Sequence, residues 1–190
     1  MSWQIVGAEH WQTQPWKNGG GVTHEILREM ANDHFGWRLS LAEINSDGPF
    51  SSFPDIDRVI TLVEGNGFTL NIDQQTVTLN KRGEFHPFAG EATTSCRLLN
   101  GPVRDLNLMC HRQYFRAEVQ CHSHQHSRLD MASADRHLVF VLAGAIQLQR
   151  TDGDCTLRTL QTALSTDGEA YGIRSLEPGS QWLQMALFRK

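Results

Sequence analysis

The chain has 190 residues, of which 39% are hydrophobic and 20% are charged, so it carries enough apolar surface for a packed core. Its 17 Lys and Arg residues are outnumbered by 21 Asp and Glu residues, which gives a net charge of −4. This balance argues against a nucleic-acid partner, because such proteins usually show a basic excess, but it is compatible with a local basic pocket for a small anion.

Neither a targeting segment nor a membrane-spanning segment is expected. Residues 1–10 (MSWQIVGAEH) lack the basic and apolar regions of a signal peptide. The longest apolar stretch, residues 138–146, has about half of the roughly 20 residues that a spanning helix needs, and we interpret it as a buried strand. The four cysteines form no C-x-x-C pair, so we expect free thiols and a cytoplasmic protein without a membrane partner.

Short segments in which apolar and polar residues alternate follow one another along the chain, as in half-buried β-strands. We expect strands at residues 37–42, 68–72, 76–79, 103–109, 114–119, 138–146, 146–149 and 181–188. Turn signals separate them, among them residues 18–21 (NGGG), 64–67 (EGNG) and 177–179 (EPG). No stretch carries an apolar helical stripe over three turns, so the pattern predicts an all-β sandwich or barrel.

The two halves of the chain resemble one another at a shift of 79 residues, which carries Gly65 onto Gly144. Residues 58–65 (RVITLVEG) then align with 137–144 (HLVFVLAG), and residues 99–109 resemble 176–185 with a slip of about two residues. Hairpins that recur by chance are the alternative, but we interpret these landmarks as a duplicated β unit. The predicted fold is all-β, a bicupin of two fused cupin-like jelly-roll barrels. Residues 1–112 would hold a ligand pocket, and residues 113–190 would form the second barrel.

The glycine-rich segment 16–26 (WKNGGGVTHEI) is the first candidate site. Its glycines let the backbone approach a ligand, and successive free N–H groups can hold an anion. If residues 22–26 form a strand, Thr23 and Glu25 share one face and His24 points away. Asn18, Thr23 and Glu25 are therefore candidate binding residues. A wide turn that leads into a strand, with no ligand, is the alternative.

A second set of polar residues alternates with apolar ones on later strands. Arg38 and Ser40 share one face, and inside a barrel an inward arginine beside a hydroxyl forms a forked donor set for a carboxylate. Arg58 offers the same choice, and Asp105 and Asn107 could complete a polar interior. Such buried groups must be paired, so they indicate either a ligand pocket or a closed internal network. On an outer face the arginines would simply be solvated.

Residues 121–126 (CHSHQH) hold three histidines at alternate positions. As one strand, His122, His124 and His126 would line a single face, where histidines two apart can share a metal. The Glu that a metal cupin carries three or four residues later is absent from residues 127–131. We therefore expect no metal site here and interpret the segment as an exposed polar loop.

Several of these segments together resemble the HutD/Ves family. The matching segments are residues 16–26, 37–54 (WRLSLAEINSDGPFSSFP), 57–65 (DRVITLVEG), 88–90 (FAG) and 99–109 (LNGPVRDLNLM). Two positions depart from the family pattern. His24 stands where the family often has Arg, and Asp55 replaces the usual Gly after F-S-x-F-P.

The resemblance implies a cytoplasmic bacterial bicupin without a demonstrated enzymatic activity. Members of the family are associated with histidine utilisation and are thought to bind a small carboxylated intermediate, such as urocanate or formiminoglutamate. The Ves branch is linked instead to stress and cold response. The change at His24 would remove a positive charge from the ligand region only if this residue faced the ligand, and strand alternation points it away.

The leading hypothesis is a non-enzymatic bicupin that binds a small carboxylate and has a regulatory role in histidine utilisation or stress response. Arg38 or Arg58 would pair with the carboxylate, and Glu25 would accept from an amino or formimino nitrogen. We expect no catalytic residue, metal or cofactor, no nucleic-acid or membrane partner, and a homodimer as one option for exposed strand edges. The substrate-binding residues would be Asn18, Thr23, Glu25, Arg38, Ser40, Arg58 and Asn107.

Two alternatives stay open. One is a metal-dependent cupin enzyme, an isomerase or a dioxygenase, that uses the histidine cluster with Glu118 or Asp130. The other is a structural bicupin without a small-molecule site, whose inward polar groups satisfy only one another.

Overall fold

The structure is a computed structural model that describes residues 3–16, 19–123, 126–129, 134–150, 153–166, 168 and 171–190, and of residues 126–129 it describes the backbone. The chain folds into two compact units. Trp11–Phe115 forms the first unit, and Met1–His10 with Arg116–Lys190 forms the second unit. The first ten residues thus group with the second unit, whereas the sequence analysis places them within residues 1–112.

Nearly all regular structure in the described residues is β-strand. The first unit contains β2 (Gln12–Pro15), β3 (Gly21–Ala31), β4 (His34–Ile44), β5 (Gly48–Pro49), β6 (Ile56–Glu64), β7 (Phe68–Ile72), β8 (Gln75–Leu79), β9 (Phe85–Ala89), β10 (Thr94–Leu98) and β11 (Val103–His111). The second unit contains β1 (Gln4–Val6), the short 3₁₀ helix η1 (Ala8–His10), β12 (Phe115–His122), β13 (His126–Leu129), β14 (Arg136–Ala143), β15 (Ala145–Gln149), β16 (Cys155–Arg158), β17 (Thr162–Ser165), β18 (Tyr171–Ser175) and β19 (Gln181–Arg189). Among the described residues of the whole chain, no helix is long and apolar enough to cross a membrane.

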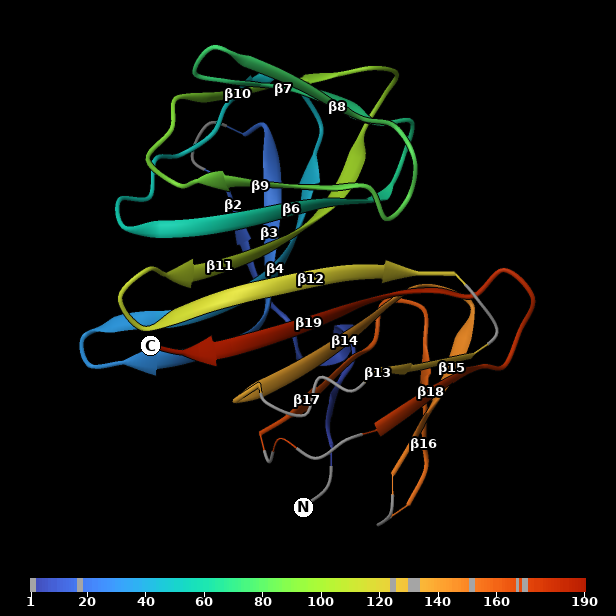
Figure 1. Ribbon diagram of the computed structural model, residues 1–190. Helices are drawn as coiled ribbons and strands as arrows, with labels where there is room; N and C mark the ends of the chain where they lie inside the picture. The colour runs from blue at the N-terminus through green and yellow to red at the C-terminus, as the bar shows by residue number, and fades with distance from the viewer. Residues whose placement is uncertain are drawn as a thin grey trace. The chain divides into compact units, whose positions relative to one another are not determined.

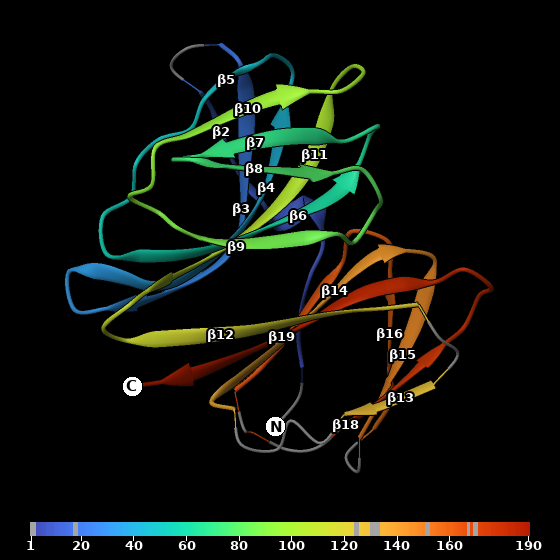
Figure 2. The ribbon, with the colours of Figure 1, turned by 45° about the horizontal axis from the view of Figure 1, so that its top comes forward.

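Two antiparallel sheets make up the first unit. Six strands in the order β2-β3-β4-β11-β6-β9 form one sheet, and four strands in the order β5-β10-β7-β8 form the other. Figure 2 shows β10, β7 and β8 running side by side in the smaller sheet. Alternating apolar residues of the two sheets supply a hydrophobic cluster that includes Ile44, Ile60, Leu62, Phe68 and Leu70.

The second unit repeats eight strands of this arrangement (Figure 1). Its sheets have the orders β1-β17-β14-β19-β12 and β13-β18-β15-β16. The order β4-β11-β6-β9 thus matches β12-β19-β14-β17, and β5-β10-β7-β8 matches β13-β18-β15-β16. Eight consecutive strands in two sheets of this connectivity form a jelly roll. The predicted all-β fold of two jelly-roll units is confirmed, and each unit is a pair of sheets rather than one continuous ring of strands.

The strand register confirms the duplication at residue level. On β6 Arg58 is opposite Met109 of β11, and on β14 His137 is opposite Ala186 of β19. The shift is therefore 79 residues from Arg58 to His137 and 77 residues from Met109 to Ala186. This difference is the slip of about two residues that the sequence indicates.

The strand pairing is irregular at the equivalent point in both copies. The pairing of β6 with β11 shifts register between Arg104 and Asp105, and the pairing of β14 with β19 shifts between Val141 and Ala143. A glycine in the left-handed region follows each irregularity, Gly65 with φ 101° and Gly144 with φ 75°. Glycine is suited to both turns because a Cβ atom is strained in this conformation.

Backbone conformation also accounts for one departure from the family pattern. Asp55 has φ 63°, a left-handed conformation that glycine adopts without strain. Aspartate is among the residues that tolerate this conformation best, so it can replace the usual Gly here while the turn keeps its shape. The turn is held by the Asp55 carbonyl, which accepts a hydrogen bond from the Arg112 amide at 2.9 Å.

Candidate functional site

A cavity of about 560 Å³ lies in the first unit. Its wall consists mainly of side chains from β2, β3, β4, β6 and β11, which all belong to the six-stranded sheet. The segment after β5 completes the wall with Phe50 and Phe53. Among the described residues that line the cavity, the charged ones are Arg38, Arg58 and Asp105.

Strand pairing explains why these side chains meet. The strand β11 lies between β4 and β6, and its residue Met109 is opposite both Arg38 on β4 and Arg58 on β6. Asn107, two residues away on β11, is opposite Ser40. Residues two apart on a strand share a face, so three neighbouring strands present their polar side chains to one cavity.

The alternation predicted for β4 is confirmed. Arg38 and Ser40 line the cavity. The intervening residues Trp37, Leu39 and Leu41 occupy the opposite face of the strand and are at most 1% exposed. Arg38 is therefore half-buried at the cavity and not fully exposed on an outer face.

A polar chain joins three of the buried residues. Arg58 Nη2 donates to Asn107 Oδ1 at 2.7 Å, and Asn107 Nδ2 donates to Asp105 Oδ1. Asp105 is fully buried, and Arg58 and Asn107 are each 6% exposed. Within the described residues, Arg58 Nε and Asp105 Oδ2 have no hydrogen-bond partner. The chain thus leaves one buried donor and one buried acceptor without a partner in this part of the molecule.

The Arg38 guanidinium contacts a sulfur atom and two aromatic rings, and burial lowers its pKa while the nearby charge of Glu25 acts to raise it. Its Nη2 lies 3.0 Å from Met109 Sδ, and its guanidinium carbon lies 5.4 Å and 5.7 Å from the ring centroids of Phe35 and Phe53. Arg38 Nε has no hydrogen-bond partner in the described part of the chain. Aromatic faces attract a cation without using its N–H groups, so this guanidinium is positioned and still able to donate.

Arg58 is surrounded by rings in the same way. Its guanidinium carbon lies 5.5 Å from the Phe50 centroid, 5.4 Å from that of Phe53 and 4.8 Å from that of Phe88. Phe53 therefore contacts both arginines. This ring therefore lies about 5 to 6 Å from both cations and attracts each of them.

Burial sets the protonation of the cavity groups. Loss of water contact lowers the pKa of Arg58 to about 10 and also lowers the pKa of Arg38. Burial raises the pKa of the Asp105 carboxyl to about 7, although the charge of Arg58 and the hydrogen bond from Asn107 oppose this rise. Near neutral pH the cavity therefore has two cations and one carboxyl group that titrates.

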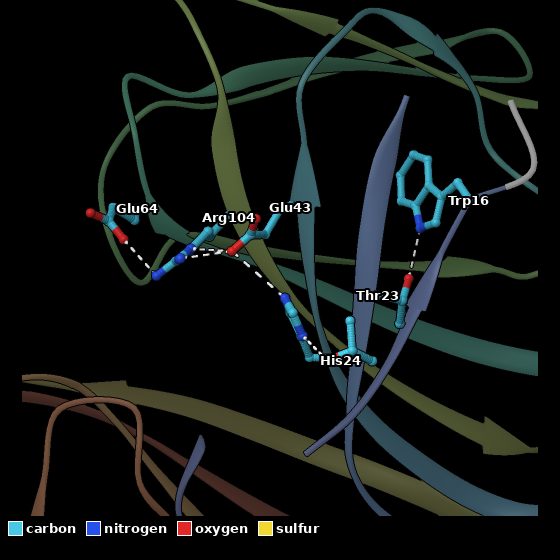
Figure 3. A network of polar contacts seen from close by, with 7 residues as sticks. Trp16, Thr23, His24, Glu43, Glu64 and Arg104 are labelled. Atoms are coloured by element: carbon cyan, nitrogen blue, oxygen red, sulfur yellow. Dashed lines mark hydrogen bonds and ion pairs between the residues drawn. The ribbon is translucent and has the colours of Figure 1, made fainter. Parts of the chain in front are cut away.

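The two faces of β3 carry different contacts, as Figure 3 shows. Thr23 lines the cavity, and its Oγ1 accepts a hydrogen bond from Trp16 Nε1 at 2.8 Å. His24 lies on the other face, where its Nδ1 is 2.9 Å from Thr13 Oγ1 and its Nε2 is 3.6 Å from Glu43 Oε1. The prediction that His24 points away from Thr23 is confirmed, so this departure from the family pattern removes no charge from the cavity.

Most of the predicted binding residues meet at this cavity. Glu25 is not among the lining residues, and its Oε1 lies 3.4 Å from Arg28 Nε. Asn18 lies outside the described residues. The other predicted residues line the cavity, namely Thr23, Arg38, Ser40, Arg58 and Asn107.

Several lining residues were not among the predicted set. Asp105 was recognised as an inward polar residue, and its spacing of two from Asn107 is the signal that selects it. Trp16, Phe50 and Phe53 lie outside regular alternation, because they come from a loop and from the segment after a two-residue strand. Periodicity gives no signal for such residues.

The histidine cluster does not form one strand. β12 ends at His122, and β13 begins at His126 in a different sheet, so these two histidines do not line one strand face. The His122 ring stacks on Trp182 with centroids 5.7 Å apart. His124 and Asp130 lie outside the described residues. Within the described residues, no three His, Cys, Asp or Glu side chains are grouped as metal ligands.

Known proteins resemble the chain over nearly its whole length. It is 36% identical over 167 residues to an uncharacterized 21.2 kDa protein in the hutC 3′ region of Pseudomonas putida, covering 87% of each chain. It is 36% identical over 171 residues to protein Ves of Citrobacter koseri, covering 88% of this chain and 85% of that one. The solved structure of HutD from Pseudomonas fluorescens SBW25 is 30% identical, with a TM-score of 0.85 and full coverage of both chains.

More distant structures share the fold alone. Solved cupin-type proteins that are at most 11% identical still superpose with TM-scores between 0.66 and 0.68. The two jelly-roll units are thus a cupin-type architecture. Residues 8–182 match the HutD family, and with the relatives above this match shows that the chain belongs to the HutD/Ves family.

Proposed function

We propose that the cavity of the first unit binds a small metabolite through its carboxylate group. The observation that carries this proposal is that Arg38 and Arg58 line the same cavity. Its described lining contains a single acidic residue, Asp105. Each guanidinium has an Nε–H without a partner in the described residues. A buried cation with unused donors costs free energy unless an anion or water satisfies it.

The surroundings of the arginines favour a carboxylate over a bulkier anion. Two oxygens of a carboxylate match the planar fork of a guanidinium, which donates along parallel N–H bonds. The rings of Phe50 and Phe53 lie near the arginines and provide an apolar wall for the rest of the ligand. A volume of about 560 Å³ is in the range of pockets that enclose metabolites.

The ligand class follows from the family and from this chemistry. Urocanate and formiminoglutamate both carry a carboxylate, and Ser40 and Thr23 add hydroxyl groups to the wall. Glu25, which was expected to accept from a ligand nitrogen, pairs with Arg28 instead. The proposal therefore covers the carboxylate end of the ligand and leaves its other end to the apolar wall.

The proposed biological role is regulation in histidine utilisation or stress response, exerted in the cytoplasm through the bound metabolite. Its support is the family membership. One relative is named for the hutC 3′ region, one solved structure is named HutD, and another relative is named Ves.

Calorimetric titration with urocanate, formiminoglutamate and glutamate tests the proposal. We expect at least one of them to bind below millimolar concentration. Arg58→Ala and Arg38→Ala should each weaken that binding by about 10- to 100-fold, the usual effect of removing a charged hydrogen-bond donor. Arg116→Ala is the matched control, because Arg116 lies in the second unit and pairs with Glu118. If no compound binds below millimolar concentration, or if all three variants bind equally, the proposed function is wrong.

A further inference from the structure

Asp105 is the cavity residue that carboxylate binding alone does not explain. It is fully buried on β11 and lines the same cavity as both arginines. Its Oδ1 accepts from Asn107, while its Oδ2 has no partner within the described residues. If Asp105 is ionised, its negative charge repels the carboxylate of a bound ligand. Both negative charges then interact with the same two arginines, Arg38 and Arg58.

We propose that Asp105 couples ligand binding to proton uptake, so that a carboxylate enters the cavity together with one proton that Asp105 takes from solvent. This inference rests on the proposed function, because it requires that an anion binds beside the arginines. It adds the regulation of the site, since anion affinity then depends on pH near neutrality.

The contacts of Asp105 identify it as the group that takes up the proton. Arg58 on β6 reaches it through Asn107, so an anion bound at Arg58 is connected to Asp105 by a continuous hydrogen-bonded chain. In the neutral form Asp105 keeps the Asn107 bond at Oδ1 and can donate from Oδ2 toward the cavity. Protonation therefore replaces a repelling charge with a hydrogen-bond donor.

Other titratable groups surround the cavity. Arg38 and Arg58 stay charged near neutral pH, because the pKa of Arg58 is lowered only to about 10. Burial, together with the charge of Asp105, raises the pKa of the Cys96 thiol to about 12, so that thiol is neutral throughout. Two further groups lie on neighbouring strands, Glu25 on β3, paired with Arg28, and His86 on β9, opposite Ile60 of β6.

The sign of the coupling follows from linkage. A bound anion disfavours ionised Asp105, so the pKa of this carboxyl, about 7 in the free protein, rises further in the complex. Affinity is highest below the pKa of the free protein and falls as pH rises between the two pKa values. In that window the expected fall is about tenfold per pH unit, with one proton taken up for each anion bound.

Formate is the appropriate probe, because it is a monocarboxylate that stays ionised from about pH 5.5 to pH 9. We would titrate formate into the isotopically labelled protein at several pH values. The Nε–H signals of Arg38 and Arg58 report anion binding, and the carboxyl ¹³C signal of Asp105 reports its protonation. Asp105→Asn removes the titration while keeping the shape of the side chain and an acceptor for Asn107.

We expect formate affinity to fall at least about tenfold between pH 6.5 and pH 8.5 in the unchanged protein and to stay constant in Asp105→Asn. Asp73→Asn is the matched control, because Asp73 is exposed and its Oδ1 accepts only from the Thr93 amide among the bonds described. This variant should behave like the unchanged protein.

Two results separate the possible failures. If formate shifts the arginine signals equally at all pH values in the unchanged protein, the proton coupling is wrong and the proposed function stands. If formate shifts neither signal at any pH, in the unchanged protein or in Asp105→Asn, the proposed anion site itself is wrong. Should Asp105→Asn fail to fold, the Asp105 ¹³C titration with and without formate still decides, and an unchanged midpoint contradicts the coupling.

Discussion

The two units have the same eight-strand connectivity but differ in what the strands turn inward. In the first unit, three neighbouring strands direct arginine, aspartate and asparagine side chains into a cavity. In the second unit, the corresponding strands β14 and β19 carry residues of the core, and Val139, Val141, Trp182 and Leu183 are completely buried there. The same strand connectivity therefore holds either a polar cavity or a packed core.

The difference can be followed at three equivalent positions. By strand register, Arg58 corresponds to His137, and Asn107 corresponds to Gln184. Asp105 is opposite Leu62, and the equivalent pair in the second unit is Trp182 opposite Val141. The titrating carboxyl of one copy is thus an indole in the other.

Local partners complete the packing of the second unit. Gln184 Nε2 donates to the Tyr171 hydroxyl at 2.7 Å, and the His137 ring meets Tyr171 edge-on with centroids 5.4 Å apart. Trp3, from the start of the chain, packs edge-on against the same tyrosine at 4.9 Å. Equivalent positions are thus buried in a packed core that includes His137 and Gln184 in one copy, and line a cavity in the other.

Truncation of the filling residue tests this contrast most strongly. Trp182→Ala should lower the free energy of unfolding by about 3–5 kcal/mol, because it leaves a large cavity in a closed core. Trp16→Ala is the matched change in the first unit, where the indole is half-buried beside an existing cavity, and it should cost less than about 2 kcal/mol. Chemical denaturation of both variants gives the comparison. Equal losses would contradict the division between a filled and an open unit.

The buried carboxyl of the first unit should reduce stability as pH rises. Asp105 has a pKa of about 7 in the folded protein, well above the ordinary value of 3.8. Between these values the folded state keeps a proton that the unfolded state has lost, so the free energy of unfolding falls with rising pH and levels off above about pH 7. Asp105→Asn should therefore be more stable than the unchanged protein at pH 8 by about 2–4 kcal/mol, and nearly equal to it at pH 4.

Denaturation of both proteins across this pH range measures the difference. Trp182 occupies the equivalent position of the second unit, so no matching pH effect is expected there. A stability difference that does not change with pH would show that Asp105 stays ionised in the folded protein, contrary to this prediction.

The shared scaffold should respond alike in both units when its turn glycines are changed. A Cβ at Gly65 would lie 2.6 Å from the Pro102 carbonyl oxygen, and a Cβ at Gly144 would lie 2.5 Å from Ser180 Oγ. Both positions also have positive φ, so each Gly→Ala change should cost about 1–3 kcal/mol, with the larger cost at Gly65, where backbone blocks the methyl group.

Gly48→Ala is the control for these turn variants, because its Cβ would meet no atom within 4 Å and its φ is not positive. It should change the free energy of unfolding by less than about 0.5 kcal/mol. If only one of the two turn variants were destabilised, the two copies would not depend on the turn in the same way.

Much of this fold can be predicted from local patterns. Alternation along residues 37–42 and 103–109 gives both the strands and the face that each side chain occupies. The 79-residue shift gives the duplication, because both copies repeat the strand, bulge and glycine turn. The pairing of β1 with β17 could not be predicted, since it joins Val6 to Thr162 across most of the chain and carries no local signal.

The candidate site was predictable to the extent that its residues lie on regular strands. Arg38 and Arg58 follow the alternation and reach the cavity. Glu25 follows it as well, but β3 shifts register between Glu25 and Leu27, and Glu25 then pairs with Arg28. Bulges and loop residues such as Phe53 depend on tertiary packing, and a two-residue period does not encode them.

The smallest expected effect comes from polar groups of the first unit that do not face the cavity. Glu43 Oε1 accepts from Arg104 Nη2 at 2.7 Å, and Arg104 Nη1 in turn lies 3.4 Å from Glu64 Oε2 (Figure 3). These side chains are 31–61% exposed, so water and salt screen the network. Glu43→Gln should lower the free energy of unfolding by less than about 1 kcal/mol and leave formate binding at Arg58 unchanged at every pH. Glu43→Gln could instead weaken formate binding as strongly as Arg58→Ala. Polar residues outside the cavity would then matter as much as those that line it, and the inward face alone would not distinguish the two copies.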